Sequence, residues 1–147
     1  MKKIMMMLVL VLTVSTTFAF RNKEVISKQA VNAFRNEFAG ATDVAWSVGK
    51  SYYKVAFTLD DQKLFAYYNN QGEFIAITRF ISSSQLPLNL QNSLKKLYSH
   101  YWISDLFEMT TNDATNYYVT FENADTKIVL KSTEGSNWSL YQKTNKI

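Results

Sequence analysis

The sequence predicts an α+β fold: a tandem repeat of one helix plus a four-stranded antiparallel sheet, with the helices packed on one face of a curved sheet. The first observation behind this prediction is an internal sequence repeat. The spacing between the repeated segments is the same in both copies, so the repeat is in register. Tyr53-Lys-Val-Ala-Phe57 recurs as Tyr117-Tyr-Val-Thr-Phe121, and Asp61-Gln-Lys-Leu64 recurs as Asp125-Thr-Lys-Ile128.

The second observation is that a helical pattern precedes the repeated strand segments in both copies. We therefore predict a single domain over residues 20–147 that contains two repeats, at about 25–81 and 86–142. Apolar and aromatic residues recur at helical spacing in both repeats: Ala30, Phe34 and Phe38 in the first match Leu90, Leu94 and Tyr98 in the second.

The first repeat should open with a helix over residues 25–38. Ser27 is expected as its N-cap, and Gly40 as the left-handed residue that ends it. After Gly40 the apolar period changes from about 3.6 to two, which predicts strands. Three turns divide this stretch into four strands in hairpin succession, at Gly49-Lys50, at Asp60-Asp61 and over residues 69–72.

The second repeat should open with a helix after Leu86-Pro87, because proline is tolerated in the first turn of a helix. His100 is expected in the last turn of that helix. Residues 110–115 are polar and predict a long loop. Strands are expected near residues 103–109, 117–121, 126–131 and 137–141.

The N-terminus predicts export. Lys2 and Lys3 precede an uncharged apolar stretch over residues 4–14, and Thr17-Phe-Ala19 offers small residues for a signal peptidase. This pattern is typical of a signal peptide over residues 1–19. The apolar stretch is shorter than the ~20 residues that a membrane span needs. We expect a periplasmic or secreted protein with no membrane span after cleavage, and the lack of cysteine excludes disulfides.

No pattern in the sequence indicates catalysis, a cofactor or a metal. His100 is the only histidine and cysteine is absent, whereas a zinc site needs three or four ligands. There is no Gly-x-Ser-x-Gly motif to support a serine nucleophile. Asp60-Asp61 is followed by Gln62, Lys63 and Leu64, which is not the oxygen-rich series of a calcium loop. We therefore expect no enzyme activity.

The charge distribution does not favour nucleic acid as a partner. Loss of Lys2 and Lys3 with the leader lowers the formal net charge from +4 to +2. The remaining basic residues are spread along the chain, whereas nucleic-acid binders usually show a clustered basic stripe.

The turns predict which strand residues face the helices. A turn at Asp60-Asp61 places Leu59 opposite Gln62, Phe57 opposite Leu64, and Val55 opposite Ala66, all on the covered side. A turn at Gly49-Lys50 places Trp46 opposite Tyr53 and Val44 opposite Val55 on the same side. Ile75, Ile77, Trp138 and Leu140 are expected to join them.

The opposite face is predicted to carry aromatic residues among lysines. Tyrosines tolerate exposure and suit strands, so this composition has a purely structural interpretation. The alternative is a partner-binding surface, since tyrosine and tryptophan are common at interface hot spots and contiguous apolar patches are seldom left unused. The candidate partner-binding residues are Tyr52, Lys54, Phe65, Tyr67, Phe74, Tyr118, Lys131 and Tyr141.

Four local motifs are distinctive: Phe34-x-x-x-Phe38-Ala-Gly40-Ala-x-x-Val44-x-Trp46, Tyr53-x-Val-x-Phe57, Tyr68-x-x-x-Gly72 and Leu86-Pro87. Together they resemble the exported PepSY-like family, which is similar to beta-lactamase inhibitor proteins. The resemblance implies repeated units of a helix and four strands, with an open concave side to the sheet. It implies no catalytic residues.

These observations predict an exported non-enzymatic module that binds a protein or peptide, of unspecified identity, through the open sheet face. Inhibition of an exported enzyme is one form that such binding takes. The alternative is a periplasmic carrier with a small-molecule cavity between helices and sheet. The large side chains of Trp46, Trp138, Phe57 and Phe121 are expected to fill that space. An enzyme is the least favoured class.

Overall fold

The computed structural model describes residues 25–147, so the predicted signal peptide lies outside the described residues. Within this range no helix is long and apolar enough to cross a membrane. The elements are α1 (Lys28–Glu37), β1 (Thr42–Val48), β2 (Tyr52–Leu59), β3 (Gln62–Asn69), β4 (Phe74–Phe80), the short 3₁₀ helix η1 (Ser83–Gln85), α2 (Leu88–Leu97), β5 (Trp102–Thr110), β6 (Thr115–Glu122), β7 (Thr126–Thr133) and β8 (Ser139–Asn145).

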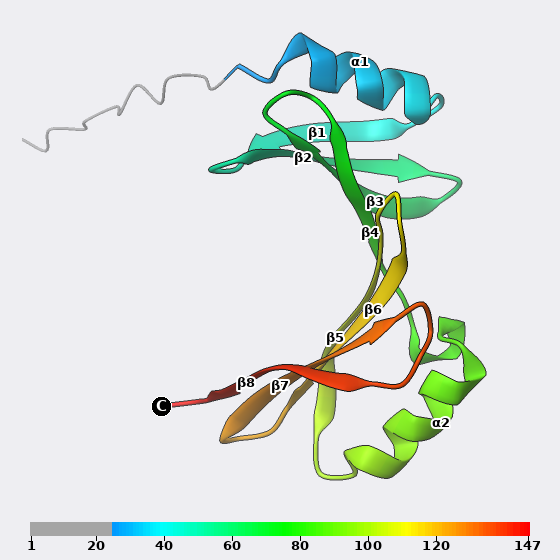
Figure 1. Ribbon diagram of the computed structural model, residues 1–147, viewed down its shortest axis with the longest axis vertical. Coiled ribbons are helices and arrows are strands. Elements are labelled where there is room, and N and C mark those ends of the chain that lie inside the picture. The colour runs from blue at the N-terminus through cyan, green and yellow to red at the C-terminus, as the bar shows by residue number, and fades with distance from the viewer. Residues whose placement is uncertain (1–24) are drawn as a thin grey trace, which may run out of the picture.

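The eight strands form one continuous antiparallel sheet in the order β1 to β8 (Figure 1). β4 pairs directly with β5, from Ile77 opposite Thr110 to Phe80 opposite Phe107. The chain is α+β, but the predicted tandem repeat, each helix with its own four-stranded sheet, is wrong. Unpaired internal edges would leave backbone donors and acceptors without partners, and the β4–β5 pairing satisfies them.

Helix α1 begins at a side-chain cap and buries one face. The Ala30 N–H donates to the Ser27 Oγ at 3.2 Å, as the sequence predicts for this N-cap. Ala30 and Phe34 are the buried residues of the helix. The chain leaves α1 through Gly40, whose φ of +91° lies in the left-handed region.

Helix α2 is shorter than predicted. It begins after Pro87 and ends at Leu97, so His100 lies in the turn that follows the helix and is exposed. The predicted position of His100 in the last helical turn is therefore wrong.

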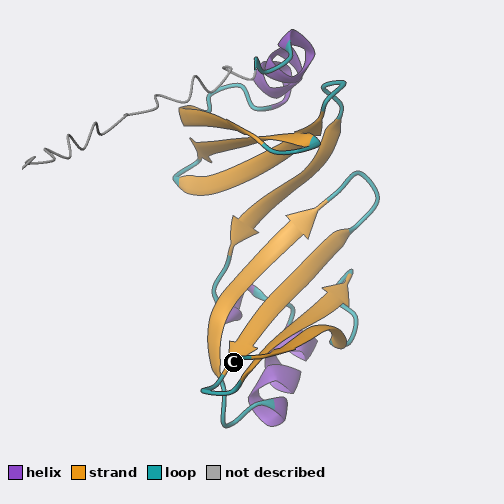
Figure 2. Cartoon of the chain, turned by 90° about the vertical axis from the view of Figure 1, so that its left-hand side faces the viewer, coloured by secondary structure: helices purple, strands orange, loops and turns teal. Residues whose placement is uncertain are grey.

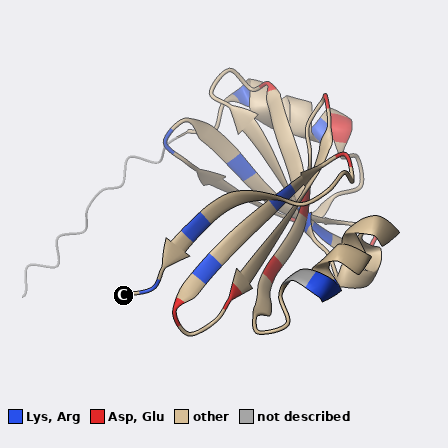
Figure 3. Cartoon of the chain, turned by 60° about the horizontal axis from the view of Figure 1, so that its bottom comes forward, with Lys and Arg blue, Asp and Glu red and all other residues tan. Residues whose placement is uncertain are grey.

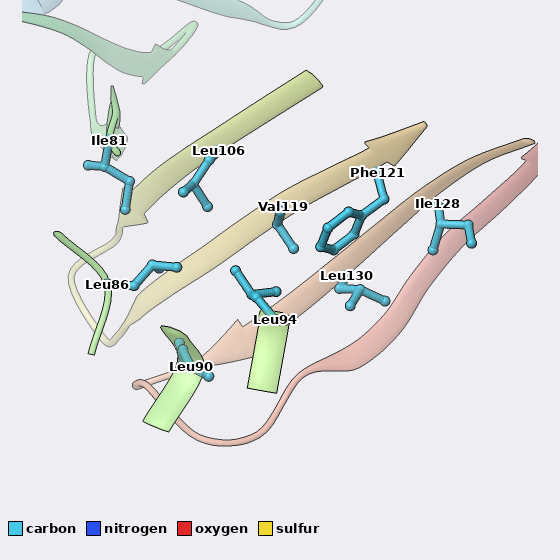
Figure 4. Close-up of a cluster of buried hydrophobic side chains, with 9 residues drawn as sticks. All are labelled: Ile81, Leu86, Leu90, Leu94, Leu106, Val119, Phe121, Ile128 and Leu130. Carbon is cyan, nitrogen blue, oxygen red and sulfur yellow. The ribbon is translucent and has the colours of Figure 1, made fainter. Parts of the chain in front are cut away.

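Both helices lie on the same face of the sheet and leave the other face uncovered (Figures 1 and 2). Each helix closes its own core. Under α1, Phe34 packs with Val55, Phe57, Ala66 and Tyr68. Under α2, the buried side chains point between helix and sheet (Figure 4), namely Ile81, Leu86, Leu90, Leu94, Leu106, Val119, Phe121, Ile128 and Leu130.

A polar group occupies the covered face between the two cores. The Arg79 guanidinium donates to the Glu108 carboxylate at 3.0 and 3.3 Å and to the Gln62 side chain at 3.0 Å. Burial and the Glu108 carboxylate raise the pKa of the nearby Tyr117 phenol. Paired charges suit this central stretch of sheet because neither helix core extends over it.

The predicted β2–β3 register is confirmed: Leu59 lies opposite Gln62, Phe57 opposite Leu64, and Val55 opposite Ala66. The β1 register differs from the prediction because the turn is longer than Gly49-Lys50: Val48 pairs with Tyr53, and the Gly49 N–H donates to the Tyr52 carbonyl. A bulge between Thr42 and Ala45 shifts the start of β1 further. Trp46 therefore pairs with Val55 instead of Tyr53, and Val44 is exposed. Trp46 stays on the covered side, with its ring 5.5 Å from that of Phe34.

A second bulge reverses two predictions in β4. Tyr67 pairs with Ala76 and Tyr68 with Phe74, which leaves Ile75 as the extra residue. Phe74 lies against Tyr68 on the covered side, with ring centroids 5.9 Å apart, and Ile75 is 43% exposed. The predictions that Phe74 faces outward and Ile75 inward are wrong, because a one-residue insertion exchanges the faces of a strand.

Gly72 fixes the distance between the β3–β4 turn and the start of α1. We expect Gly72→Ala to lower the free energy of unfolding by roughly 2–5 kcal/mol, which combines left-handed strain with overpacking. Its φ is +85°, and an added Cβ would lie 2.6 Å from the Ala30 nitrogen. Urea denaturation measures the change.

Gly40→Ala is the matched control for this prediction. Gly40 has the same left-handed backbone, but an added Cβ would meet nothing within 4 Å. It should therefore show the backbone strain alone, about 1–2 kcal/mol. An equal decrease in the free energy of unfolding for the two variants would show that the β3–β4 turn does not pack closely against α1.

Candidate functional site

The uncovered face of the sheet carries a continuous row of aromatic side chains. We call Phe65, Phe80, Phe107, Tyr118 and Tyr141 the aromatic track; they come from β3, β4, β5, β6 and β8. Successive ring centroids are 6.1, 6.5, 4.9 and 5.5 Å apart. Phe107 and Tyr118 are stacked, whereas the other pairs meet edge to face. The track links both halves of the sheet.

Strand alternation brings these rings to one face. Ile81, directly after β4, and Leu106 on β5 point into the α2 core, so Phe80 and Phe107 beside them point the other way. Phe80 lies directly opposite Phe107 across the β4–β5 pair. The joining of the two halves of the sheet is therefore what makes the track continuous.

Lysine ammonium groups lie over the rings. Lys54 Nζ is 4.5 Å from the centroid of Phe65 and 5.8 Å from that of Tyr67. Lys63 lies 6.0 Å from Phe65 on the same face. Towards the other end, Lys131 Nζ is 5.8 Å from the centroid of Tyr118. These are cation–π distances, so the rings and cations form one mixed surface.

Two hollows lie on this face and share Phe107 as a wall. The smaller, about 230 Å³, is lined by Lys54, Phe65, Tyr67 and Phe80 among others. The larger, about 510 Å³, lies over β5 to β8. Its lining residues are Phe107, Met109, Tyr118, Thr120, Lys127, Val129, Tyr141, Gln142 and Thr144.

The carboxylate of Glu122 is already paired with lysines, one of which, Lys127, lines the larger hollow. Glu122 lies 2.7 Å from Lys146 Nζ and 3.8 Å from Lys127 Nζ. Hydrogen bonds from Lys146 and Ser104 hold the pKa of Glu122 below its usual value. Basic residues recur along the strands (Figure 3). The charge that remains on this face is consequently positive.

The predicted binding residues are brought together with the exception of Phe74. Tyr52 and Tyr67 lie 5.8 Å apart on the uncovered face beside Lys54. Phe65, Tyr118, Lys131 and Tyr141 lie in or over the aromatic track. Whether these residues bind a partner remains a prediction.

Sequence reasoning missed Phe80 and Phe107, which lie at the centre of the track. The available signal was alternation: each adjoins an apolar residue on the covered side. Trp138 lies against the α2 core and donates from Nε1 to the Leu90 carbonyl at 3.2 Å. Leu140 lies opposite Leu130, but at the sheet edge it is 64% exposed.

Other hollows lie outside the aromatic track. One of about 500 Å³ is lined mainly by the β5–β6 turn, Pro87 and Glu134. Another of about 300 Å³ opens between α1 and β1, with Trp46 in its wall. The prediction that large side chains fill the space between helices and sheet therefore fails at this edge. Across residues 25–147 no group of histidine and carboxylate side chains is arranged to hold a metal.

Solved structures with the same fold come from Bacteroides species. A BLIP-like protein from Bacteroides fragilis is 18% identical, with a TM-score of 0.70 over 82% of this chain and 86% of that chain. A DUF2874 family protein from Bacteroides ovatus is 17% identical, with a TM-score of 0.72 over 82% and 88%. A third, from Bacteroides eggerthii and described as a candidate periplasmic protein, is 13% identical, with a TM-score of 0.71 over 82% and 89%.

Sequence comparison adds no family. No protein-family model matches the chain, and no curated protein matches it in sequence. The resemblance to the PepSY-like family thus stays a prediction. At these identities the structural likeness establishes the fold alone, and that fold is BLIP-like.

Proposed function

We propose that the protein is an exported, non-enzymatic module that binds a protein or peptide through the uncovered face of its sheet. The observation that carries this proposal is the aromatic track. Its rings come from five strands that no helix covers on this face. Phe80 at its centre is 65% exposed and Tyr141 61%, whereas Tyr118 is packed beneath its neighbours at 8%. Monomeric proteins seldom leave contiguous apolar surface of this kind without a use.

The composition of the face also favours a macromolecular partner. Aromatic residues are the commonest hot spots of protein interfaces, and here they are held in fixed positions by strands. Binding through a sheet surface loses little conformational entropy of the protein, because the backbone of the sheet is already ordered. The predicted signal peptide and the structural neighbour from Bacteroides eggerthii, described as a candidate periplasmic protein, support a periplasmic or secreted location. Inhibition of an exported enzyme is one form of this binding.

The second candidate function is a periplasmic small-ligand carrier. The observation that favours it is the larger hollow, because about 510 Å³ lies in the usual range for ligand pockets. The hollow lies on the open face instead of between helix and sheet. A carrier would bind one small molecule there and show no dependence on Phe80, which does not line this hollow.

Affinity capture tests the proposed function. The immobilised protein is exposed to the exported proteins of its native cell, beside Phe80→Asp and Leu88→Asp variants. Leu88 is the matched control because it is 75% exposed on α2, on the other side of the sheet. We expect a partner that the wild type and Leu88→Asp retain and that Phe80→Asp loses, since a buried charge in an interface is costly.

Two outcomes would contradict the proposal. Equal retention by Phe80→Asp would place the binding site elsewhere on the molecule. Capture of no protein by the wild type, together with saturable binding of a small molecule in the larger hollow, would favour the carrier.

A further inference from the structure

We propose that the uncovered face recognises an acidic, extended peptide segment, whose carboxylates pair with Lys54, Lys63 and Lys131 and whose apolar side chains enter the hollows beside Phe107. This inference rests on the proposed function and names the chemistry of the partner. It follows from the charges that the fold leaves unused on this face.

The three lysines have no carboxylate partner among residues 25–147. The ion pairs in this part of the chain join Arg79 to Glu108, and Lys127 and Lys146 to Glu122. Lys54, Lys63 and Lys131 instead lie over Phe65, Tyr67 and Tyr118. Their positive charge is thus held at defined positions while remaining available for a second interaction.

The three lysines lie near the two ends of the aromatic track. Lys54 of β2 and Lys63 of β3 lie over Phe65. Lys131 of β7 lies over Tyr118 of β6. An elongated ligand with carboxylates along its length would reach both ends. Asp105 lines the smaller hollow and is exposed, and it would disfavour a carboxylate at that one position. Between the ends, the ligand meets apolar rings and the two hollows.

The geometry of the rings favours a peptide over an acidic glycan. Sugar rings bind on broad, exposed ring faces. Here Phe80 meets Phe65 and Phe107 edge to face, at 86° and 75°, and Phe107 and Tyr118 are stacked on each other. The surface therefore offers pockets between rings instead of a flat platform. Such pockets suit the separate side chains of an extended peptide.

Selection from a random linear peptide library tests the inference. The purified protein is immobilised, and bound clones are sequenced after washing at low salt. We expect enrichment of peptides that combine several Asp or Glu residues with Leu, Met or aromatic residues. Binding of the best peptide should weaken as salt rises, because exposed charge pairs are screened.

Charge-neutral variants identify the residues responsible. The double variant Lys54→Gln and Lys131→Gln should bind the selected peptide about tenfold more weakly, with an unchanged melting temperature. Lys95→Gln, on the last turn of α2, is the matched control and should bind as the wild type does. Replacing Glu by Gln in the peptide should remove most of the difference between wild type and double variant.

The outcomes separate the two proposals. Enrichment of neutral or basic apolar peptides that still need Phe80 would overturn the acidic segment while leaving the binding face intact. Enrichment of peptides whose binding is unaffected by Phe80→Asp would overturn both. Binding of polygalacturonate with no peptide enrichment would assign the face to an acidic glycan and would also overturn the inference.

Discussion

Replacing Phe57 with alanine should lower the free energy of unfolding by about 3–5 kcal/mol, the cost of truncating a fully buried aromatic side chain. Phe57 is 1% exposed, and its ring lies 5.0 Å from Phe34 and 4.8 Å from Phe38. Together with Val55, it forms the contact between β2 and α1. A domain of this size has a total stability of about 5–15 kcal/mol, so much of it depends on this side chain.

Phe65→Ala is the matched control for Phe57→Ala. Phe65 is also a strand phenylalanine near the same turn, but it points to the uncovered face, where Lys54 lies over it. Phe65→Ala should lower the free energy of unfolding by clearly less, nearer the ~0.5 kcal/mol typical of surface changes. Denaturant unfolding of both variants measures the two values. Equal losses would show that the two faces of β2 and β3 are assigned incorrectly.

Replacing Phe80 with alanine should weaken partner binding by about 2 kcal/mol or more, which is roughly thirtyfold in affinity. Phe80 is the exposed centre of the track, between Phe65 and Phe107. Its removal opens the surface at the point where the two halves of the sheet meet. The melting temperature should hardly change because the side chain is mostly outside the cores.

Leu88→Ala controls for the loss of any exposed apolar side chain, since Leu88 is 75% exposed on α2. Calorimetric titration with the captured partner or the selected peptide measures both affinities. Loss of folding with Phe80→Ala would show that Phe80 belongs to the hydrophobic core and would contradict its place on the uncovered face. Equal affinity in Phe80→Ala and wild type would reduce the track to ordinary strand surface.

Local rules predicted part of this fold well. The Asp60-Asp61 turn, with both residues at positive φ, determined the whole β2–β3 register. Ser27 was identifiable as a cap because it precedes a helical pattern. These features depend on residues close together in the sequence, where turn and capping chemistry decide the structure.

The pairing of β4 with β5 and the bulge in β4 were not predictable from local sequence signals. The β4–β5 pairing joins strands that η1 and α2 separate in the chain, and no local signal indicates it. The bulge beside Ile75 exchanged the faces of Phe74 and Ile75, and an inserted residue leaves the alternation of side chains ambiguous. The centre of the track at Phe80 and Phe107 follows from that same distant pairing.

A methyl-resonance NMR titration tests the binding face most directly. Val129 and Met109 line the larger hollow on the uncovered face, whereas Val119 and Leu90 lie in the α2 core. On titration with the tightest-binding selected peptide, the Val129 and Met109 methyl resonances should shift and those of Val119 and Leu90 should stay in place. Shifts confined to Val119 and Leu90 would place the ligand at the helix side and contradict a binding surface on the uncovered face.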